Sequence, residues 1–192
     1  MAVSFERDTL GAGGRALHDI GLAAILGGNL FARIGMHPAL REVTDPRERG
    51  KVVNAAWRRY GTVNSLALAA LLSGWTASRA GEPDRRTLRE RERALAIARD
   101  AAVGTVAVTG VAAGIQGMRF SKMEPEGGIP LEDGSEAGGG ASADESRTKR
   151  RLDLLGAVHL ASALSLMGLN AAVSRAELAP RSGRRRRLRC GR

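Results

Sequence analysis

Long stretches without a charged side chain limit the fold of this chain more than any other feature. Residues 154–174 contain His159 as their one titratable side chain, and residues 62–77 and 101–118 contain none. A helix that spans a bilayer needs about 20 mostly apolar residues, whereas a surface helix of a soluble protein keeps a polar face. Because residues 101–118 and 154–174 have no charged face, they predict membrane-spanning helices and not the helices of a soluble bundle.

A further apolar segment, interrupted by polar residues, precedes the others. We place the four spans at about residues 16–36, 62–78, 98–118 and 153–174. The predicted fold is all-α, an antiparallel bundle of four transmembrane helices within residues 1–178, with helical extensions beyond the membrane. The mean hydropathy of −0.17 is low for such a protein because the connecting segments are rich in charge.

The segment before the second span is expected to extend that helix beyond the membrane. Asp45 suits the N-cap, Pro46 the first helical position and Glu48 the third position of a capping box. Trp57 and Tyr60 follow at helical spacing and fit the aromatic belt at a membrane surface. The second helix is therefore predicted to begin near Pro46, well ahead of the membrane.

Two segments lack the pattern of a packed helix. Residues 121–147 are rich in Gly, Ser and acidic residues, which predicts a flexible loop before the fourth helix. Residues 179–192 are predicted to be a disordered, Arg-rich tail that holds much of the formal net charge of +10. Four consecutive residues of this tail suit anionic lipid headgroups, at about 1 kcal/mol each: Arg184, Arg185, Arg186 and Arg187.

A membrane-tethered nucleic-acid binder is the alternative interpretation of the tail. No aromatic side chain lies nearby in the sequence to stack on a base. We therefore expect the lipid bilayer, and not nucleic acid, as the partner of the tail.

The distribution of Lys and Arg predicts the orientation. The side that holds both termini carries 17 of these residues, with Arg99 at the start of the third span included, and the other side carries 12. By the positive-inside rule, both termini are cytoplasmic and residues 121–147 lie outside. The sequence shows no removable signal peptide, and the expected location is the cytoplasmic membrane, which the chain crosses several times.

The first span, "HDIGLAAILGGNLFARIG" (residues 18–35), carries polar residues within an apolar run. Thirteen residues separate Asp19 from Arg33, which is about 20 Å of helix. The two are therefore expected near opposite membrane surfaces, with Arg33 extended outward. His18 and Asn29 are eleven positions apart, so they share one face of the helix.

The fourth span repeats part of this pattern. Alignment of residues 16–29 with residues 157–170 gives four identities, among them His18 with His159 and Asn29 with Asn170. Chance is the alternative explanation in a chain of this composition. Three further polar residues lie on one face of the third span and extend any polar network there: Thr105, Thr109 and Gln116.

The first and fourth spans of such a bundle run antiparallel. His18 is then expected at the depth of Asn170, and Asn29 at the depth of His159. This geometry predicts two interhelical polar pairs, worth about 0.6 to 2 kcal/mol each, and disfavours a haem held between the two histidines. The pairs are interpreted as packing contacts. A substrate or ion path is the alternative, since polar residues inside a membrane are functional candidates by default.

Small residues on the spans indicate close helix packing and equally suit a homo-oligomer interface: Gly28, Gly74, Gly110, Gly114 and Gly168. Motifs of known chemistry are absent. The sequence has no Walker loop, dinucleotide fingerprint, nucleophile elbow or HExxH motif, and it has a single cysteine. His37 is expected in a turn that ends the first span. We therefore expect no catalytic residue, no metal and no cofactor.

Three stretches carry a resemblance to a family: "LGGNLFARIGMHPAL" (26–40), "RERALAIARDAAVGTVAVTGVAAGIQG" (91–117) and "GIPLEDGSE" (128–136). Through them the chain resembles uncharacterised small four-span integral membrane proteins of high-GC actinobacteria over most of its length. This implies the four-span fold and no particular function. A weaker likeness to anthrone-oxygenase-like four-span proteins rests on "HPAL" and on the spacing of Trp57 and Tyr60, and it carries no catalytic residue over.

The sequence therefore predicts an integral membrane protein that is a structural or accessory component of the cytoplasmic membrane. The alternative is a small membrane oxidoreductase, oxygenase or carrier that acts on a lipophilic substrate through His18 or His159.

Overall fold

Four long helices make up most of the computed structural model, which describes residues 2–80 and 88–178. They are α1 (Ala2–Phe31), α3 (Pro46–Ala80), α4 (Glu90–Phe120) and α5 (Ala143–Leu178). The described residues contain no β-strand and only one isolated bridge, between Leu131 and Ala137. The all-α prediction is confirmed.

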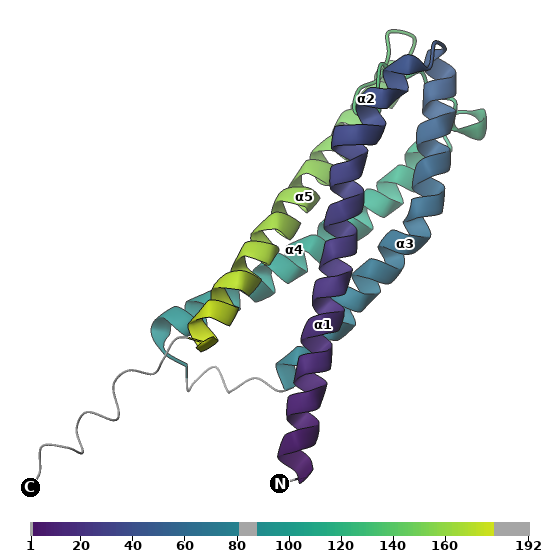
Figure 1. The fold of residues 1–192 in the computed structure, drawn as a ribbon. Coiled ribbons are helices and arrows are strands. Elements are labelled where there is room, and N and C mark those ends of the chain that lie inside the picture. The colour runs from purple at the N-terminus through teal and green to yellow at the C-terminus, as the bar shows by residue number, and fades with distance from the viewer. Residues whose placement is uncertain (1, 81–87, 179–192) are drawn as a thin grey trace, which may run out of the picture.

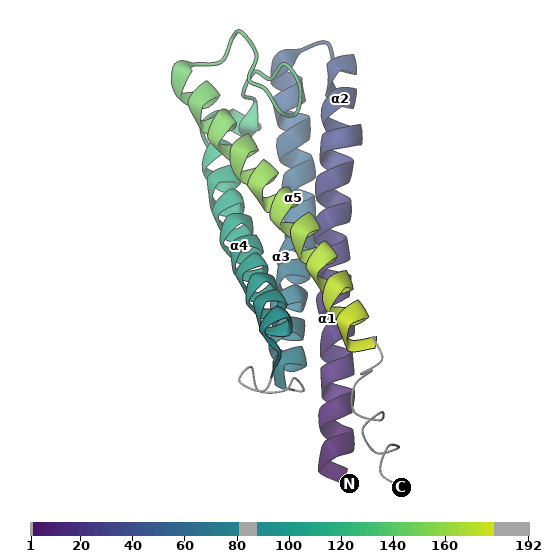
Figure 2. The same cartoon turned by 90° about the vertical axis from the view of Figure 1, so that its left-hand side faces the viewer.

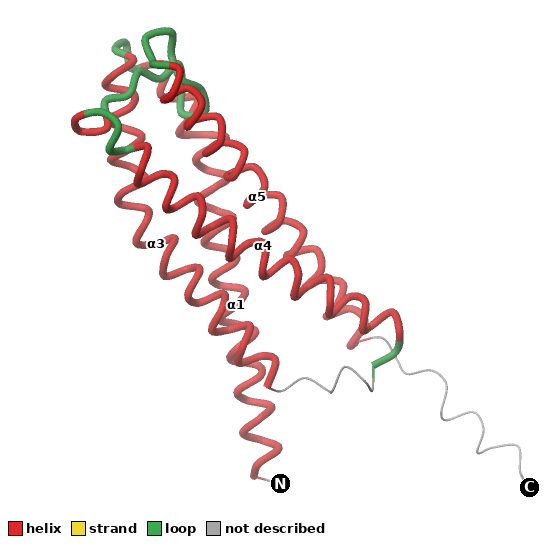
Figure 3. Tube along the Cα trace, turned by 180° about the vertical axis from the view of Figure 1, so that it is seen from behind, coloured by secondary structure: helices red, strands yellow, loops and turns green. Residues whose placement is uncertain are grey.

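The helices form two antiparallel hairpins, α1 with α3 and α4 with α5 (Figure 1). The connections within both hairpins lie at one end of the bundle (Figure 3), and the start of α1 and the end of α5 lie at the other. In the view of Figure 2, α5 crosses over from α4 towards α1. The result is an antiparallel four-helix bundle in which α3 and α4 make few contacts.

All four helices supply the core that joins the hairpins. It consists of Leu22, Ile25, Leu26, Ala67, Leu71, Val103, Val106, Ala163 and Leu166. These apolar side chains make the main contact between the two hairpins. Where such surface is removed from water, its burial contributes about 25 cal/mol per Å².

Backbone contact holds α1 against α3. A Cβ atom at Gly74 would overlap the backbone nitrogen of His18 and lie 2.6 Å from the carbonyl oxygen of Gly14. One at Gly21 would lie 2.5 Å from the carbonyl oxygen of Ala67. Only a residue without a side chain allows this approach, so Gly74 lies at the contact of α1 with α3, together with Gly14 and Gly21.

The other predicted packing glycines divide into two groups. Gly28 lies against the Tyr60 ring, and Gly110 lies against the imidazole of His159, so both are at helix contacts. Gly114 and Gly168 are exposed, and a Cβ atom there would meet nothing within 4 Å. The predicted packing role is wrong for these two within a single chain, because both face away from the bundle.

Helix α3 begins where the sequence predicts, but its cap differs. The amide of Arg47 donates a hydrogen bond of 2.8 Å to Asp45 Oδ1, so Asp45 caps the helix. Glu48 does not complete a capping box and instead accepts a hydrogen bond of 2.9 Å from Lys51 Nζ.

The first hairpin turns through several short elements. After α1 the chain continues as a π-helical turn (Ala32–Met36), then α2 (His37–Ala39) and a 3₁₀ turn (Leu40–Glu42). His37 is buried in this region, consistent with the turn predicted at the end of the first span.

The connection between α4 and α5 is packed against the bundle. We call residues 121–142 the cap. Ile129 and Leu131 are fully buried in the cap, where they join Leu40, Val53 and Phe120 in a second apolar cluster. The prediction of a flexible loop over residues 121–147 is therefore wrong for the buried part of the cap, and residues 143–147 belong to α5.

Among the described residues, three helices are long and apolar enough to cross a membrane. They are α1 with its continuation (Thr9–Glu42), α4 (Glu90–Phe120) and most of α5 (Ala143–Arg175). The predicted second span, residues 62–78, lies in α3, which does not reach the same hydropathy because residues such as Asn64, Ser65 and Ser73 interrupt it.

Candidate functional site

A small polar pocket lies between the two hairpins, at the end of the bundle away from the cap. Residues from all four long helices line it: Arg15, His18, Asp19, Trp75, Ser78, Arg99, Asn170, Val173 and Ser174. Its volume is about 40 Å³, which is room for a few water molecules. We call it the His18 pocket.

His18 is 5% exposed, and its hydrogen bond defines its tautomer. Nδ1 lies 3.0 Å from the carbonyl oxygen of Leu71. A carbonyl only accepts, so we assign the proton of the neutral ring to Nδ1. Nε2 then carries a lone pair, and no side chain or backbone group of the described residues donates to it.

The predicted pair of His18 with Asn170 does not form, although both residues line the same pocket. Asn170 Nδ2 donates instead to Asp19 Oδ1, at 3.1 Å. Asn170 therefore lies at the level of His18, as predicted, but its partner is Asp19. The neighbouring residue on α1 faces Asn170, because successive helical residues differ by about 100° around the axis.

Further polar contacts join α3 to α4 at the level of the His18 pocket. Trp75 Nε1 donates a hydrogen bond of 3.0 Å to Asp100 Oδ1, and the Arg79 guanidinium lies 3.8 Å from the same carboxylate. Arg99 is 8% exposed and lines the pocket. None of these contacts was predicted. Arg79, Arg99 and Asp100 lie at charged helix ends that resemble solvated segments, and Trp75 lies in an uncharged window.

The predicted pair of Asn29 with His159 does not form either. Asn29 Nδ2 donates to the carbonyl oxygen of Ile25 within α1, at 2.8 Å. His159 is 3% exposed, and its Nδ1 lies 3.0 Å from Thr109 Oγ1. The Thr109 hydroxyl donates to the carbonyl oxygen of Thr105, at 2.6 Å, so it accepts from His159.

Two members of the predicted network on the third span lie outside that contact. The hydroxyl of Thr105 is exposed and donates to the carbonyl oxygen of Ala101 within α4, at 2.9 Å. Gln116 is partly exposed near the cap end of α4. The polar contact with α5 therefore rests on Thr109 alone.

Arg33 joins α1 to α5 at the cap end. Its Nη2 lies 3.4 Å from Asp153 Oδ1 and donates to the backbone carbonyl of Asp153 at 3.1 Å. Its side chain thus reaches the start of the apolar segment of α5, and its extension towards a membrane surface stays a prediction. With Asp19 and Asn170 at the other end, α1 and α5 are tied by polar contacts at both ends of their apolar segments.

An apolar groove lies between α1 and α3, close to the cap end. Its lining is Gly28, Phe31, Ala32, Met36, Ala56, Trp57, Arg59, Tyr60 and Val63, and its volume is about 370 Å³. We call it the α1–α3 groove. Tyr60 anchors it, since its hydroxyl donates to the carbonyl oxygen of Ala24 at 2.6 Å.

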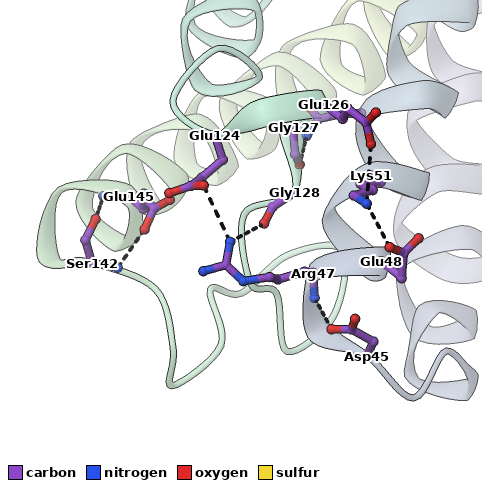
Figure 4. Close-up of polar contacts among 11 residues, drawn as sticks. Asp45, Arg47, Glu48, Lys51, Glu124, Glu126, Gly127, Gly128, Ser142 and Glu145 are labelled. Carbon is purple, nitrogen blue, oxygen red and sulfur yellow. Dashed lines mark hydrogen bonds and ion pairs between the residues drawn. The ribbon is translucent and has the colours of Figure 1, made fainter.

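Polar contacts attach the cap to the start of α3 (Figure 4). Arg47 reaches Glu124 and the carbonyl oxygen of Gly128, each at 3.4 Å. Lys51 lies between Glu48 and Glu126, at 2.9 and 3.3 Å, and these carboxylates raise the pKa of Lys51 through hydrogen bonds and charge. Every one of these contacts joins segments far apart in the sequence, except that of Lys51 with Glu48.

Asp133 organises the turn of the cap. Its side chain is 9% exposed, and burial alone would raise the pKa of the carboxyl group. Hydrogen bonds from the hydroxyl and amide of Ser135, the amide of Glu136 and the Arg41 guanidinium outweigh burial, so the net pKa lies below its usual value. The buried ammonium of Lys149 donates to the carbonyl oxygen of Gly134 in the same turn.

Two further predictions concern the Arg-rich tail and metal binding. Arg184, Arg185, Arg186 and Arg187 lie outside the described residues. Across residues 2–80 and 88–178, no group of three or more His, Cys, Asp and Glu side chains is placed to hold a metal ion.

Comparison with known proteins finds no match for this chain, whether among family models, curated proteins or solved structures.

Proposed function

We propose that the chain is an integral membrane protein whose four long helices all cross the cytoplasmic membrane, and that it is a structural or accessory component of that membrane. The observation that carries this proposal is the outward face of the bundle. Large apolar side chains point away from the core on every long helix, and on α4 they are Ile97, Val108, Val111, Ile115 and Met118. Soluble monomers rarely expose contiguous apolar areas above a few hundred Å².

Helix α3 is part of the proposal despite its lower hydropathy. Residues 61–78 carry no charge, and the outward side chains Val63 and Leu66 are 47% and 67% exposed. Three hydroxyl groups of this segment bond within the helix: Ser73 donates to the carbonyl oxygen of Ala69 at 2.7 Å, Thr76 to that of Ser73 at 2.8 Å, and Ser78 to that of Trp75 at 2.9 Å. Such bonds lower the cost of placing a hydroxyl group in lipid.

A structural role agrees with the dimensions of the polar sites. The His18 pocket, at about 40 Å³, is far smaller than the 300–1,000 Å³ or so of pockets that hold cofactors and drug-sized ligands. His18 bonds to α3 whereas His159 bonds to α4, and His159 does not line the His18 pocket. The oxidoreductase, oxygenase or carrier alternative would therefore act through one histidine alone, and the pocket beside His18 is too small for a lipophilic substrate.

The proposed orientation has both termini in the cytoplasm and the cap outside. It rests on the excess of Lys and Arg on the side of the termini. In this arrangement the Arg-rich tail meets the anionic cytoplasmic leaflet. Assembly into a homo-oligomer remains a prediction, for which the outward-facing Gly114 and Gly168 leave room on the lipid-exposed surface.

Accessibility of single cysteines to a membrane-impermeant maleimide tests the topology in intact cells. Gly139 is exposed and has nothing within 4 Å of its would-be Cβ, so Gly139→Cys with Cys190→Ser should fold normally and be labelled from outside. Arg91→Cys, in the first turn of α4, should be labelled only after lysis. External labelling at Arg91→Cys would contradict the crossing of α3 or the proposed orientation. The wild-type chain is the control, since its Cys190 is expected in the cytoplasm and should be labelled only after lysis.

Extraction tests the membrane assignment itself. The protein should stay in the membrane pellet through high salt and alkaline carbonate and dissolve only in detergent. Release by salt alone would identify a peripheral or soluble protein.

A further inference from the structure

We propose that the α1–α3 groove is a specific site for one anionic phospholipid of the surrounding bilayer, with an acyl chain in the groove and the phosphate at Arg59. The inference rests on the proposed membrane location and goes beyond it, because it names a ligand and a site.

The shape of the groove suits an acyl chain. Its lining is almost wholly apolar, and its volume of about 370 Å³ is many times that of the His18 pocket. Phe31 and Val63, 68% and 47% exposed, stand at its edges, so the groove opens sideways on the outer face of the bundle. A ligand enters such a groove from the hydrocarbon layer and not from water.

Local structure produces the groove from three features. Gly28 has no side chain and lets the Tyr60 ring lie directly on α1, where the hydroxyl bonds to Ala24. Ala32 and Ala56 are small residues on the two helices that line it. The π-helical turn Ala32–Met36 supplies two of the lining residues, and such turns are rare and occur frequently at functional sites.

The charge at the groove suits a phosphate. Arg59 is exposed and lines the groove, and among the described residues no carboxylate pairs with it. The cap-end cations Arg33, Arg41, Arg47 and Lys51, by contrast, all have carboxylate partners. Trp57 and Tyr60 mark the membrane surface at this level, where a lipid has its phosphate and the start of its acyl chains.

The two tryptophans of the chain provide the assay. Trp57 lines the α1–α3 groove, whereas Trp75 lines the His18 pocket at the other end. Brominated lipids quench the fluorescence of a tryptophan that they contact. The full chain with Trp75→Phe, which leaves Trp57, is to be reconstituted into two series of vesicles, with matched, rising mole fractions of brominated phosphatidylglycerol in one and of brominated phosphatidylcholine in the other.

Trp57 should be quenched at about fivefold lower mole fraction by phosphatidylglycerol, the ratio that one cation gives at an anionic surface. Arg59→Gln should abolish this preference and Arg59→Lys should retain much of it. Arg58→Gln is the matched control, since Arg58 is exposed and adjacent but does not line the groove. Ala56→Leu should fill the groove and weaken quenching by both lipids.

Several outcomes would overturn the proposal. Equal quenching by the two lipids, or an equal effect of Arg58→Gln and Arg59→Gln, would show only the general attraction of a basic surface. If Trp57 became less accessible to quenching as the protein-to-lipid ratio rose, the occupant of the α1–α3 groove would be a second copy of the chain. If the wild-type chain, which keeps both Trp57 and Trp75, showed no quenching by either lipid, the membrane location would itself be wrong, which is a distinguishable result.

Discussion

Replacement of Gly74 by alanine should separate α1 from α3 and destabilise the bundle. The new Cβ atom would overlap the His18 backbone nitrogen and lie 2.6 Å from the Gly14 carbonyl oxygen, and neither backbone atom can rotate away. Overpacking of this kind costs about 1–3 kcal/mol. Separation of the helices also breaks the 3.0 Å bond from His18 to Leu71, at about 1 kcal/mol. The higher helix propensity of alanine returns up to about 1 kcal/mol.

The expected net loss is about 1–3 kcal/mol, measured by thermal or chemical unfolding in one detergent. Gly114→Ala is the matched control, because its Cβ atom would meet nothing within 4 Å and the same gain in propensity applies. Gly114→Ala should therefore be neutral or up to about 1 kcal/mol more stable than the wild type. If Gly74→Ala were as stable as the wild type or Gly114→Ala, α1 and α3 would not make the close backbone contact of this structure.

Three further predictions concern individual contacts. Thr109→Val should cost about 1–3 kcal/mol in detergent unfolding because His159 Nδ1 loses its acceptor, whereas Thr105→Val, whose hydroxyl is exposed, should change little. Leu131→Ala should cost about 2–5 kcal/mol locally and open the cap to trypsin at Lys122, with membrane extraction unchanged; full protection would contradict a packed cap. The ionised carboxylate of Asp133 should stabilise the cap fully above the unfolded-state pKa of 3.8, and this contribution should fade as pH falls through the lower folded-state pKa. Asp133→Asn should remove this part of the acid dependence of cap unfolding, measured by Trp57 fluorescence. An acid transition equal to that of the wild type would refute the assignment.

The helices were predictable because long uncharged windows leave few alternatives. Residues 101–118 and 154–174 lie within α4 and α5, and Asp45 marks the start of α3. The partners of the polar residues were not predictable from the same pattern. Antiparallel order sets depth along the membrane normal, but the rotation of each helix sets which residue faces which, and rotation depends on packing. Asn170 therefore meets Asp19 where His18 was expected.

The cap shows a different limit of sequence reasoning. Residues 121–142 have the average composition of a disordered segment, yet Ile129 and Leu131 are fully buried among glycines. Two apolar residues suffice because Leu40 of the 3₁₀ turn, Val53 of α3 and Phe120 at the end of α4 already provide an apolar surface. Charged residues such as Arg99 and Asp133 were missed because burial of a charge depends on partners distant in the sequence.

The position of the cap has a consequence for biogenesis. The cap binds the first hairpin through contacts between residues 73 to 97 positions apart, from Asn54 with Gly127 to His37 with Gly134, and Arg47 with Glu124 lies between these limits. During synthesis the α1–α3 hairpin, whose glycines make its own close contact, is complete before any cap residue emerges. The second hairpin therefore joins the first at a late step. Until the cap is synthesised, Arg47 and Asn54 lack their hydrogen bonds to the carbonyl oxygens of Gly128 and Gly127. A chain stopped before residue 121 would contain the α1–α3 hairpin and α4, and the apolar surface of Leu40 and Val53 that the cap covers would be exposed.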